Sequence, residues 1–142
     1  MSTPFHNTVD LRGIHFEDRM VTMTLASAIV KADEGKPVTI DSANNRVKIA
    51  GDGESIFGVL RVVEDRTVDG IKVGTIEMNY IAEWSIKSGD TLAVGDVAVG
   101  STVSGEVKKG TLTTSTVDGN IKPWGHNVVV SVSGGLAVVV KQ

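Results

Sequence analysis

IFGVLRVVEDRTVDGIKVGTIEM, residues 56–78, is the stretch that decides the fold class of this chain. Its first part, Ile56–Glu64, is the strongest strand signal in the sequence, and Asp69-Gly70 separates it from the alternating run Ile71–Met78. Asp-Gly between two such runs is among the best short-range indications of a β-hairpin. Gly58 interrupts the first run and indicates a bulge or a close approach between backbones. The stretch therefore predicts two antiparallel strands joined by a tight turn.

The rest of the chain repeats the same residue chemistry. Its 142 residues include 23 Val, 10 Ile and 13 Thr against 6 Leu. β-branched side chains are stiff at χ1, which suits a pleated sheet better than a helix. The 16 glycines supply turn positions, and only 3 prolines interrupt the pattern. This composition is typical of a domain built from many short strands.

Short alternating runs bounded by turn residues continue outward from the hairpin in both directions. Asn44-Asn45 and Gly134-Gly135 are two of the further turn signals, and Ala26–Ala32 is the one stretch that suits a short helical turn. The further expected strands are Arg19–Leu25, Lys36–Ile40, Arg46–Ala50, Tyr80–Ile86, Thr91–Val94, Val97–Val99, Ser104–Lys108, Thr111–Ser115, Asn127–Ser133 and Leu136–Val140.

Strands at this spacing predict an all-β fold, which is a small barrel, a jelly roll or a sandwich of short antiparallel strands. The first residues differ from the rest, because Met1–Asp18 is polar, shows little periodicity and contains Pro4. We therefore expect an extended N-terminal arm, residues 1–18, followed by a single all-β domain, residues 19–142.

The C-terminal run Asn127–Val140, NVVVSVSGGLAVVV, is apolar on both faces. An antiparallel strand with one face in water would alternate between apolar and polar residues. An exposed hairpin of this kind would be an aggregation hazard. Either the hairpin is central and covered on both sides, or it meets another subunit. We predict the second arrangement, with Val129 and Val139 in the interface of a homo-oligomer.

Composition and charge exclude several classes of site and partner. The chain has no cysteine, which rules out disulfides, thiolate catalysis and zinc–thiolate sites. A net charge of −3 leaves no basic excess to neutralise phosphates, so no nucleic-acid partner is expected. There is no long apolar run and no signal-peptide pattern, so we expect no membrane partner and synthesis in the cytoplasm.

Glycine-rich motifs for catalysis or nucleotide binding each fail at one position. The stretch Gly53–Phe57 begins like a nucleophile elbow but lacks its final glycine, and no long helix follows. Gly51-Asp52-Gly53 begins like a dinucleotide-binding loop, yet Ile56 stands where the last glycine is needed. We therefore predict that the protein is not an enzyme and binds no nucleotide cofactor.

Metal-binding patterns are also missing from the sequence. The three histidines, His6, His15 and His126, show no pair at the i, i+2 or i, i+4 spacing of a metal site. Acidic pairs at positions 33–34 and at positions 52 and 54 do not belong to a twelve-residue calcium loop. No metal and no other cofactor are predicted.

The two tryptophans call for different interpretations. Trp84 lies within an expected strand, where a tryptophan most often packs in the core or at its rim. Trp124 lies in the turn-like segment Pro123-Trp124-Gly125-His126, where a large ring is hard to bury locally. Since tryptophan is enriched in binding hot spots, we predict that Trp124 contacts a partner.

Several short β-turn patterns together resemble one known class of protein. They are Ala28–Ala32 leading through Gly35–Val38, the strand Ile56-Phe57-Gly58-Val59-Leu60, the hairpin Asp69–Gly74 and the Gly-Asp steps within Gly89–Val99. The chain resembles the head decoration, or cement, proteins of tailed bacteriophages. The resemblance covers roughly residues 27–99, and each of its motifs is a turn pattern with no catalytic chemistry.

The resemblance implies an all-β barrel or jelly roll on the outer surface of an icosahedral virion capsid. It implies a non-enzymatic homodimer or homotrimer at a local symmetry axis, where each copy clamps neighbouring major capsid subunits. A polar arm can lie along such a neighbour, so we predict capsid contacts at Phe5, His6 and Phe16. Trp124 is the fourth predicted capsid contact. The alternative function is a β-sandwich binding module for carbohydrate or a host surface. A small all-β enzyme acting through Asp52, Glu54 and His126 is the third hypothesis.

Overall fold

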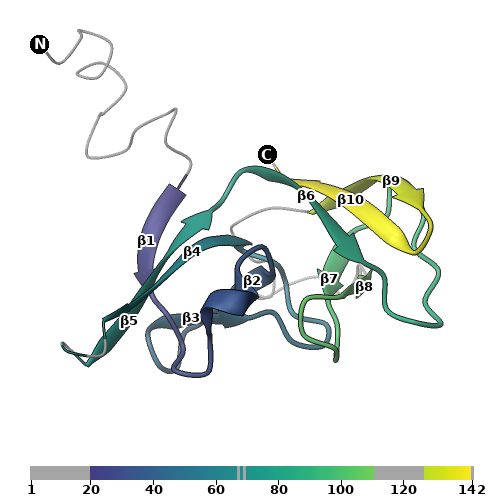
Figure 1. Ribbon diagram of the computed structural model, residues 1–142. Helices are drawn as coiled ribbons and strands as arrows, with labels where there is room; N and C mark the ends of the chain where they lie inside the picture. The colour runs from purple at the N-terminus through teal and green to yellow at the C-terminus, as the bar shows by residue number, and fades with distance from the viewer. Residues whose placement is uncertain (1–19, 67, 69, 111–126, 142) are drawn as a thin grey trace, which may run out of the picture.

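The computed structural model describes residues 20–66, 68, 70–110 and 127–141, which form ten strands and one turn of 3-10 helix (Figure 1). The expected all-β class of short antiparallel strands is confirmed. The strands are β1 (Met20–Thr24), β2 (Pro37–Asp41), β3 (Arg46–Ile49), β4 (Gly58–Arg66), β5 (Ile71–Glu77), β6 (Tyr80–Ser85), β7 (Ala98–Gly100), β8 (Val107–Lys109), β9 (Val128–Ser133) and β10 (Leu136–Lys141), and the helical turn is η1 (Lys31–Asp33).

Five strands form one sheet in the order β1-β5-β4-β2-β3. The hairpin predicted around Asp69-Gly70 is the β4–β5 pair, and Gly70 at its turn has a φ of 69°. The hairpin predicted around Asn44-Asn45 is the β2–β3 pair, where Asn45 has a φ of 50°. Glycine and asparagine tolerate this left-handed conformation better than other residues do. Both local sequence signals therefore produced the expected turns.

The five-stranded sheet curls until its two edges meet at one end. Leu25, just after β1, forms a parallel bridge with Val47 of β3, and the Ala26 amide donates to the Val47 carbonyl at 2.8 Å. The curled sheet encloses a set of buried apolar side chains that we call the first core. Its members are Leu25, Ala26, Ile29, Val38, Val47, Leu60, Val63 and Ile76.

Gly58 is a point of close approach, as the sequence predicted. A Cβ atom at this position would lie 2.6 Å from the Glu77 carbonyl oxygen of β5 and 2.6 Å from the Ile76 side chain. Real Cβ atoms do not come so close, so only glycine lets the start of β4 cross β5 here. The bulge of this hairpin lies further on, between Leu60 and Val62.

The remaining strands form a three-stranded sheet, β6-β10-β9, and a two-stranded sheet, β7-β8. Isolated bridges from Val97 to Val128 and from Ile86 to Val107 join the two sheets. Between the three-stranded sheet, β7–β8 and the start of β4 lies a second core. Its members are Ala50, Ile56, Val59, Tyr80, Trp84, Leu92, Ala98, Val107, Val129, Ala137 and Val139.

Strand β4 serves both cores, which explains its apolar sequence. Val59 belongs to the second core and the next residue, Leu60, to the first, and both are fully buried. Successive side chains of a strand point to opposite faces, so a strand between two cores needs apolar residues at both odd and even positions. The strongest strand signal in the sequence therefore marks the element that lies between the two cores.

Three local predictions need correction. The strand expected over Ser104–Lys108 forms only at Val107–Lys109, because the chain turns just before it, where the Glu106 amide donates to the Val103 carbonyl at 3.1 Å. No strand forms over Thr91–Val94, because Asp96 turns the chain: its carboxylate accepts from the Ala93 amide at 2.8 Å, and its own amide donates to the Ala93 carbonyl at 3.0 Å. The helical turn expected within Ala26–Ala32 forms only at the end of that stretch, at Lys31–Asp33.

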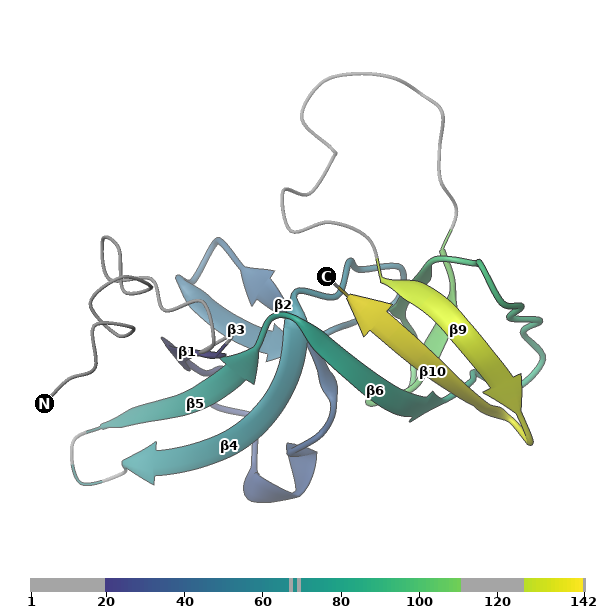
Figure 2. The same cartoon turned by 90° about the horizontal axis from the view of Figure 1, so that it is seen from above.

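Figure 2 views the three-stranded sheet face-on, with β10 between β6 and β9. In Figure 1 the same sheet forms the upper right of the molecule, with β7 and β8 below it. No helix among the described residues has both the length and the apolar character that a membrane crossing needs. The N-terminal arm and the strand predicted over Thr111–Ser115 lie outside the described residues.

Candidate functional site

The antiparallel register of β6-β10-β9 determines which side chains share its outward side. Strand β10 is central, and its residues Leu136, Val138 and Val140 alternate with buried neighbours. Cross-strand partners lie on the same side of a sheet. Three rows therefore cross this side of the sheet. They are Ile81–Val140–Val128, Glu83–Val138–Ser131 and Ser85–Leu136–Ser133, each written from β6 through β10 to β9.

We call the nine side chains of these rows the outer face. Its first row is apolar on all three strands, and Ile81 in that row is 69% exposed. Val128 and Leu136 are each 38% exposed, while Val138 and Val140 are partly buried. Polar residues stand only on the flanking strands, in the second and third rows. The outer face is thus an apolar strip along β10, with an apolar first row and polar residues on both sides of the second and third rows.

The opposite side of the sheet lies in the second core, and this overturns one prediction. Val129 and Val139 pair with each other across β9 and β10, and both side chains are fully buried within the single chain. Neither side chain is available to a second subunit, so the two residues are not interface residues. The residues that alternate with them, such as Val128 and Val138, point to the outward side of the hairpin.

A polar network beneath the outer face attaches the sheet to the rest of the domain. The Tyr80 hydroxyl donates to Oδ1 of Asn127, and Asn127 Nδ2 donates to the Ile56 carbonyl at 3.0 Å. Both side chains are almost completely buried, and burial raises the pKa of the Tyr80 hydroxyl above its ordinary value. Satisfied buried polar groups of this kind impose one arrangement on the elements they join.

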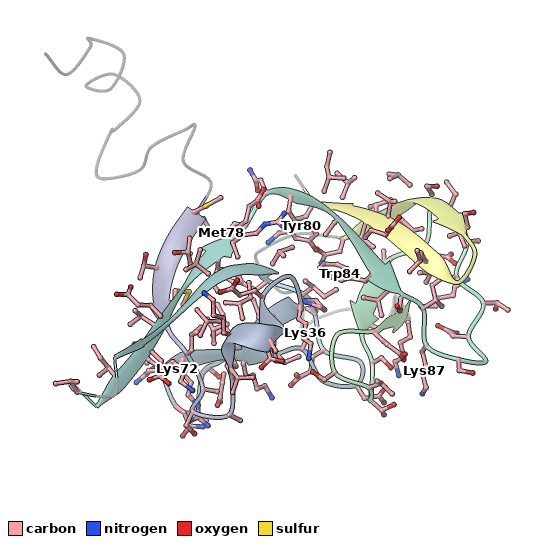
Figure 3. The ribbon with its side chains drawn as sticks, viewed as in Figure 1. Lys36, Lys72, Met78, Tyr80, Trp84 and Lys87 are labelled. Carbon is pink, nitrogen blue, oxygen red and sulfur yellow. The ribbon has the colours of Figure 1, made fainter. Side chains whose placement is uncertain are left out.

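Trp84 links the two parts of the domain directly. Its indole nitrogen donates to the Gly35 carbonyl at 2.7 Å, and its ring meets the Tyr80 ring edge-on at 5.5 Å between centroids. Figure 3 shows Tyr80 and Trp84 on the same strand, both directed toward the interior of the molecule. The prediction that Trp84 packs in the core is confirmed, since only 5% of its surface is exposed.

Lys141 ends β10 on the buried side of the sheet. Its ammonium group donates to the Phe57 carbonyl at 2.5 Å and lies 5.1 Å from the centroid of the Phe57 ring. Burial lowers the pKa of this lysine to about 8, because a charged ammonium is poorly solvated there. The contact joins the C-terminal strand to the start of β4.

The acidic pairs weighed as metal ligands are engaged in local structure. Asp52 pairs with Lys108 at 2.7 Å, and this hydrogen bond lowers the pKa of its carboxyl group. Glu54 pairs with Lys48 at 2.8 Å and also accepts from the Gly51 amide. Within the described ranges, no three His, Cys, Asp or Glu side chains form a group suited to a metal ion.

The predicted capsid contacts Phe5, His6, Phe16 and Trp124 lie outside the described residues. The sequence analysis did not identify the individual residues of the outer face. The two Val-Val-Val runs predicted a strand pair that is apolar on both sides. They did not show which of the alternating side chains face the core. The hydrogen bonds of Gly95 and Asp96 to Val129 settle the orientation, and they come from a turn distant in the sequence.

No family model, curated protein or solved structure matches this chain.

Proposed function

We propose that this protein is a non-enzymatic virion structural protein that binds the outer surface of an icosahedral phage capsid. It clamps neighbouring major capsid subunits, and it does so as a homodimer or homotrimer at a local symmetry axis. The capsid and the oligomer come from the sequence resemblance. The surface that supports the proposal is the outer face, and this single feature carries the argument.

An apolar surface of this kind suits contact with another protein. Large apolar residues exposed singly are common, but a contiguous group rimmed by polar side chains marks an interaction site. Ile81, Val140 and Val128 lie side by side across three strands, and Leu136 and Val138 extend the strip. Covering each of these side chains contributes on the order of 1 kcal/mol. Such modest contacts become tight when an oligomer makes several of them at once.

The carbohydrate-binding alternative gains no support from the described residues. Sugar-binding surfaces commonly use exposed aromatic rings. Tyr80 and Trp84 are buried in the second core, and Phe57 lies under the Lys141 ammonium group. The outer face consists of aliphatic and small polar side chains, which suit a protein surface.

The proposal is tested by mixing the protein with undecorated phage heads, pelleting the heads and measuring the native mass of the bound protein. We expect saturable co-sedimentation of a defined oligomer. Ile81→Lys and Leu136→Lys, both on the outer face, should weaken binding about tenfold or more. Thr22→Lys, at an exposed position of β1, is the matched control and should bind like the unchanged protein.

Two results contradict the proposal. If the unchanged protein stays in the supernatant at every concentration, capsid binding is wrong. If the protein pellets but all three lysine variants bind equally well, the outer face is not the contact surface.

A further inference from the structure

Residues 26–34, between β1 and β2, form a segment that we call the strap, and the helical turn η1 lies within it. Ile29 is the one large apolar side chain of the strap that is buried, and it belongs to the first core. Its neighbour Val30 is 52% exposed. A single large side chain therefore anchors the strap in the core, while most of its other residues face solvent.

The residues on either side of the strap are held by backbone hydrogen bonds. Before it, the Leu25 amide donates to the Lys72 carbonyl of β5 at 2.8 Å. After it, the Gly35 amide donates to the Leu60 carbonyl of β4 at 2.5 Å, and the Gly35 carbonyl accepts from the Trp84 indole. Gly35 has a φ of 94°, a conformation that glycine adopts at little cost. The strap thus runs between two fixed points.

The side chain of Lys72 joins the first half of the strap to β5. Its ammonium group donates to the Ser27 carbonyl at 2.9 Å and to the Ile29 carbonyl at 2.5 Å. Its ion pair with Asp65 is longer, at 3.8 Å, and only 16% of the lysine side chain is exposed. Hydrogen bonds from a charged donor are stronger than neutral ones. Lys72 is therefore placed to act as a latch on the strap.

Two further hydrogen bonds join the strap to the sheet, one near each end. The Ala26 amide donates to the Val47 carbonyl of β3 at 2.8 Å. The Glu34 carboxylate accepts from the Val63 amide of β4 at 3.1 Å. Both amides are shielded only while the strap lies on the sheet, so their exchange with solvent reports its position.

Contacts within the strap and with the next residues give it a shape of its own. The Asp33 carboxylate accepts from the Val30 amide at 2.9 Å and from the Lys36 ammonium group at 2.7 Å. The Asp33 amide donates to the Val30 carbonyl at 2.9 Å. Figure 3 shows Lys72 and Lys36 on either side of this helical turn. These bonds do not involve the sheet, so they persist when the strap leaves it.

We propose that the strap is a latched cover of the first core, which opens as one unit between Leu25 and Gly35 and is held closed by Lys72. Opening withdraws Ile29 from the core and frees the Val63 amide, while the strands stay paired. It exposes much less apolar surface than unfolding does, so it occurs far more often. The proposal goes beyond the proposed function, because it concerns the five-stranded sheet and not the outer face.

The test is hydrogen exchange of single backbone amides, followed by NMR on the full chain. In the unchanged protein, Ala26 and Val63 should share one protection factor, although they are distant in sequence. Leu25 and Gly35, at the fixed points, should be protected at least tenfold more. Low concentrations of urea should hardly change exchange at Ala26 and Val63, because their opening exposes little surface.

Variants of Lys72 test the latch. Lys72→Met keeps the stem without the ammonium group and should speed exchange at both Ala26 and Val63 by about tenfold or more. Lys72→Arg keeps the charge but not the compact donor and should have a smaller effect. The matched control is Lys48→Met, which removes an ion pair with Glu54 from β3 of the same sheet and should leave both amides unchanged.

Two outcomes overturn the proposal. The first is protection of Ala26 and Val63 equal to that of Leu25 and Gly35, with the urea dependence of global unfolding, because the strap would then have no opening of its own. The second is faster exchange at Ala26 alone in the Lys72 variants, because the strap would then not open as one unit. Neither measurement involves a capsid, so failure here leaves the proposed function to its own test.

Discussion

The two sheets of this protein present different outer surfaces. On the five-stranded sheet, outward positions carry threonines and ion pairs such as Arg46–Asp41 at 3.1 Å and the Arg61–Glu77 pair, with the exposed apolar side chains Met20 and Val62 scattered among them. On the three-stranded sheet, the outward positions of β10 are all apolar, and none of the ion pairs among the described residues involves β6, β9 or β10. The first surface therefore mixes charged and polar groups with scattered apolar ones, whereas the outward positions of β10 form an unbroken apolar strip.

This difference supports the proposal that the outer face meets another protein. A sheet with one solvated face normally alternates between apolar and polar residues, and β3 follows that rule with Arg46 and Lys48 around buried Val47. Strand β10 breaks the rule, because Leu136, Val138 and Val140 point away from the second core. A departure of this kind from the pattern of the same molecule marks a functional surface.

The largest expected effect comes from adjacent residues of β10. Val139→Lys places a charge in the second core and should lower the free energy of unfolding by several kcal/mol, enough to prevent folding. Val138→Lys changes the outer face and should alter stability by less than about 1 kcal/mol. Denaturant titration followed by circular dichroism measures both. Equal effects would contradict the assignment of Val139 to the core and Val138 to the outer face.

The next effect concerns the polar network that holds the three-stranded sheet in place. Asn127→Ala leaves the buried Tyr80 hydroxyl without its acceptor, which should cost about 1–3 kcal/mol of stability. Adding Tyr80→Phe to that variant should recover part of the loss, because no hydroxyl then needs a partner. Denaturation midpoints of the single and double variants provide the comparison, and strictly additive losses would argue against this hydrogen bond.

Lys141 should make stability depend on alkaline pH. Its pKa of about 8 in the folded protein lies below the ordinary value of 10.5, so the unfolded chain binds more protons between these values. The free energy of unfolding should therefore rise from about pH 8 toward pH 10, by on the order of 1–3 kcal/mol. Near pH 10 the trend should reverse, because the raised pKa of Tyr80 makes the unfolded chain lose its phenol proton first.

The matched variant for this prediction is Lys141→Met, which keeps the length of the side chain without the charge. It should remove the rise between pH 8 and 10 while leaving the loss above pH 10. Denaturant titrations at pH 7.5, 9, 10 and 11 measure both trends. A rise that persists in Lys141→Met assigns the pH dependence to another group.

The smallest effect is expected on the charged surface of the five-stranded sheet. Arg46→Ala removes a partly exposed ion pair with Asp41 and should change stability by less than about 1 kcal/mol. Thermal unfolding at low and high salt checks this value, since screening should reduce it further. A loss above 2 kcal/mol would mean that these charges stabilise the sheet more than exposed ion pairs do.

Local signals predicted the turns and strands of this chain well. Asp69-Gly70 and Asn44-Asn45 produced the expected hairpins, because the conformation of a tight turn depends on the residues within it. Gly58 was predicted to mark a bulge or a close approach, because a glycine inside a strand is costly without such a reason, and the structure shows the close approach. The strand expected over Thr91–Val94 failed because the Asp96 carboxylate forms a turn that alternation does not reveal.

The candidate site was predicted only in part. The apolar runs around Gly134-Gly135 indicated a hairpin with two apolar faces, but Val129 and Val139 were assigned to the wrong side. A shift of one residue moves every side chain of a strand to the other side of the sheet. The runs Val128–Val130 of β9 and Leu136–Val140 of β10 are apolar at successive positions, so the sequence does not show which side is buried. Only contacts with Asp96 and β6, which are distant along the chain, select the buried side.

The sequence by itself determined the all-β class, the positions of the hairpins and the unusual apolar character of the C-terminal strands. These properties depend on residues that are neighbours along the chain, through χ1 stiffness, turn conformation and alternation. The tertiary structure alone decided that β4 lies between two cores, that Trp84 joins the sheets through Gly35, and which valines face outward. These depend on long-range packing, because burial is a property of the assembled fold and not of a segment.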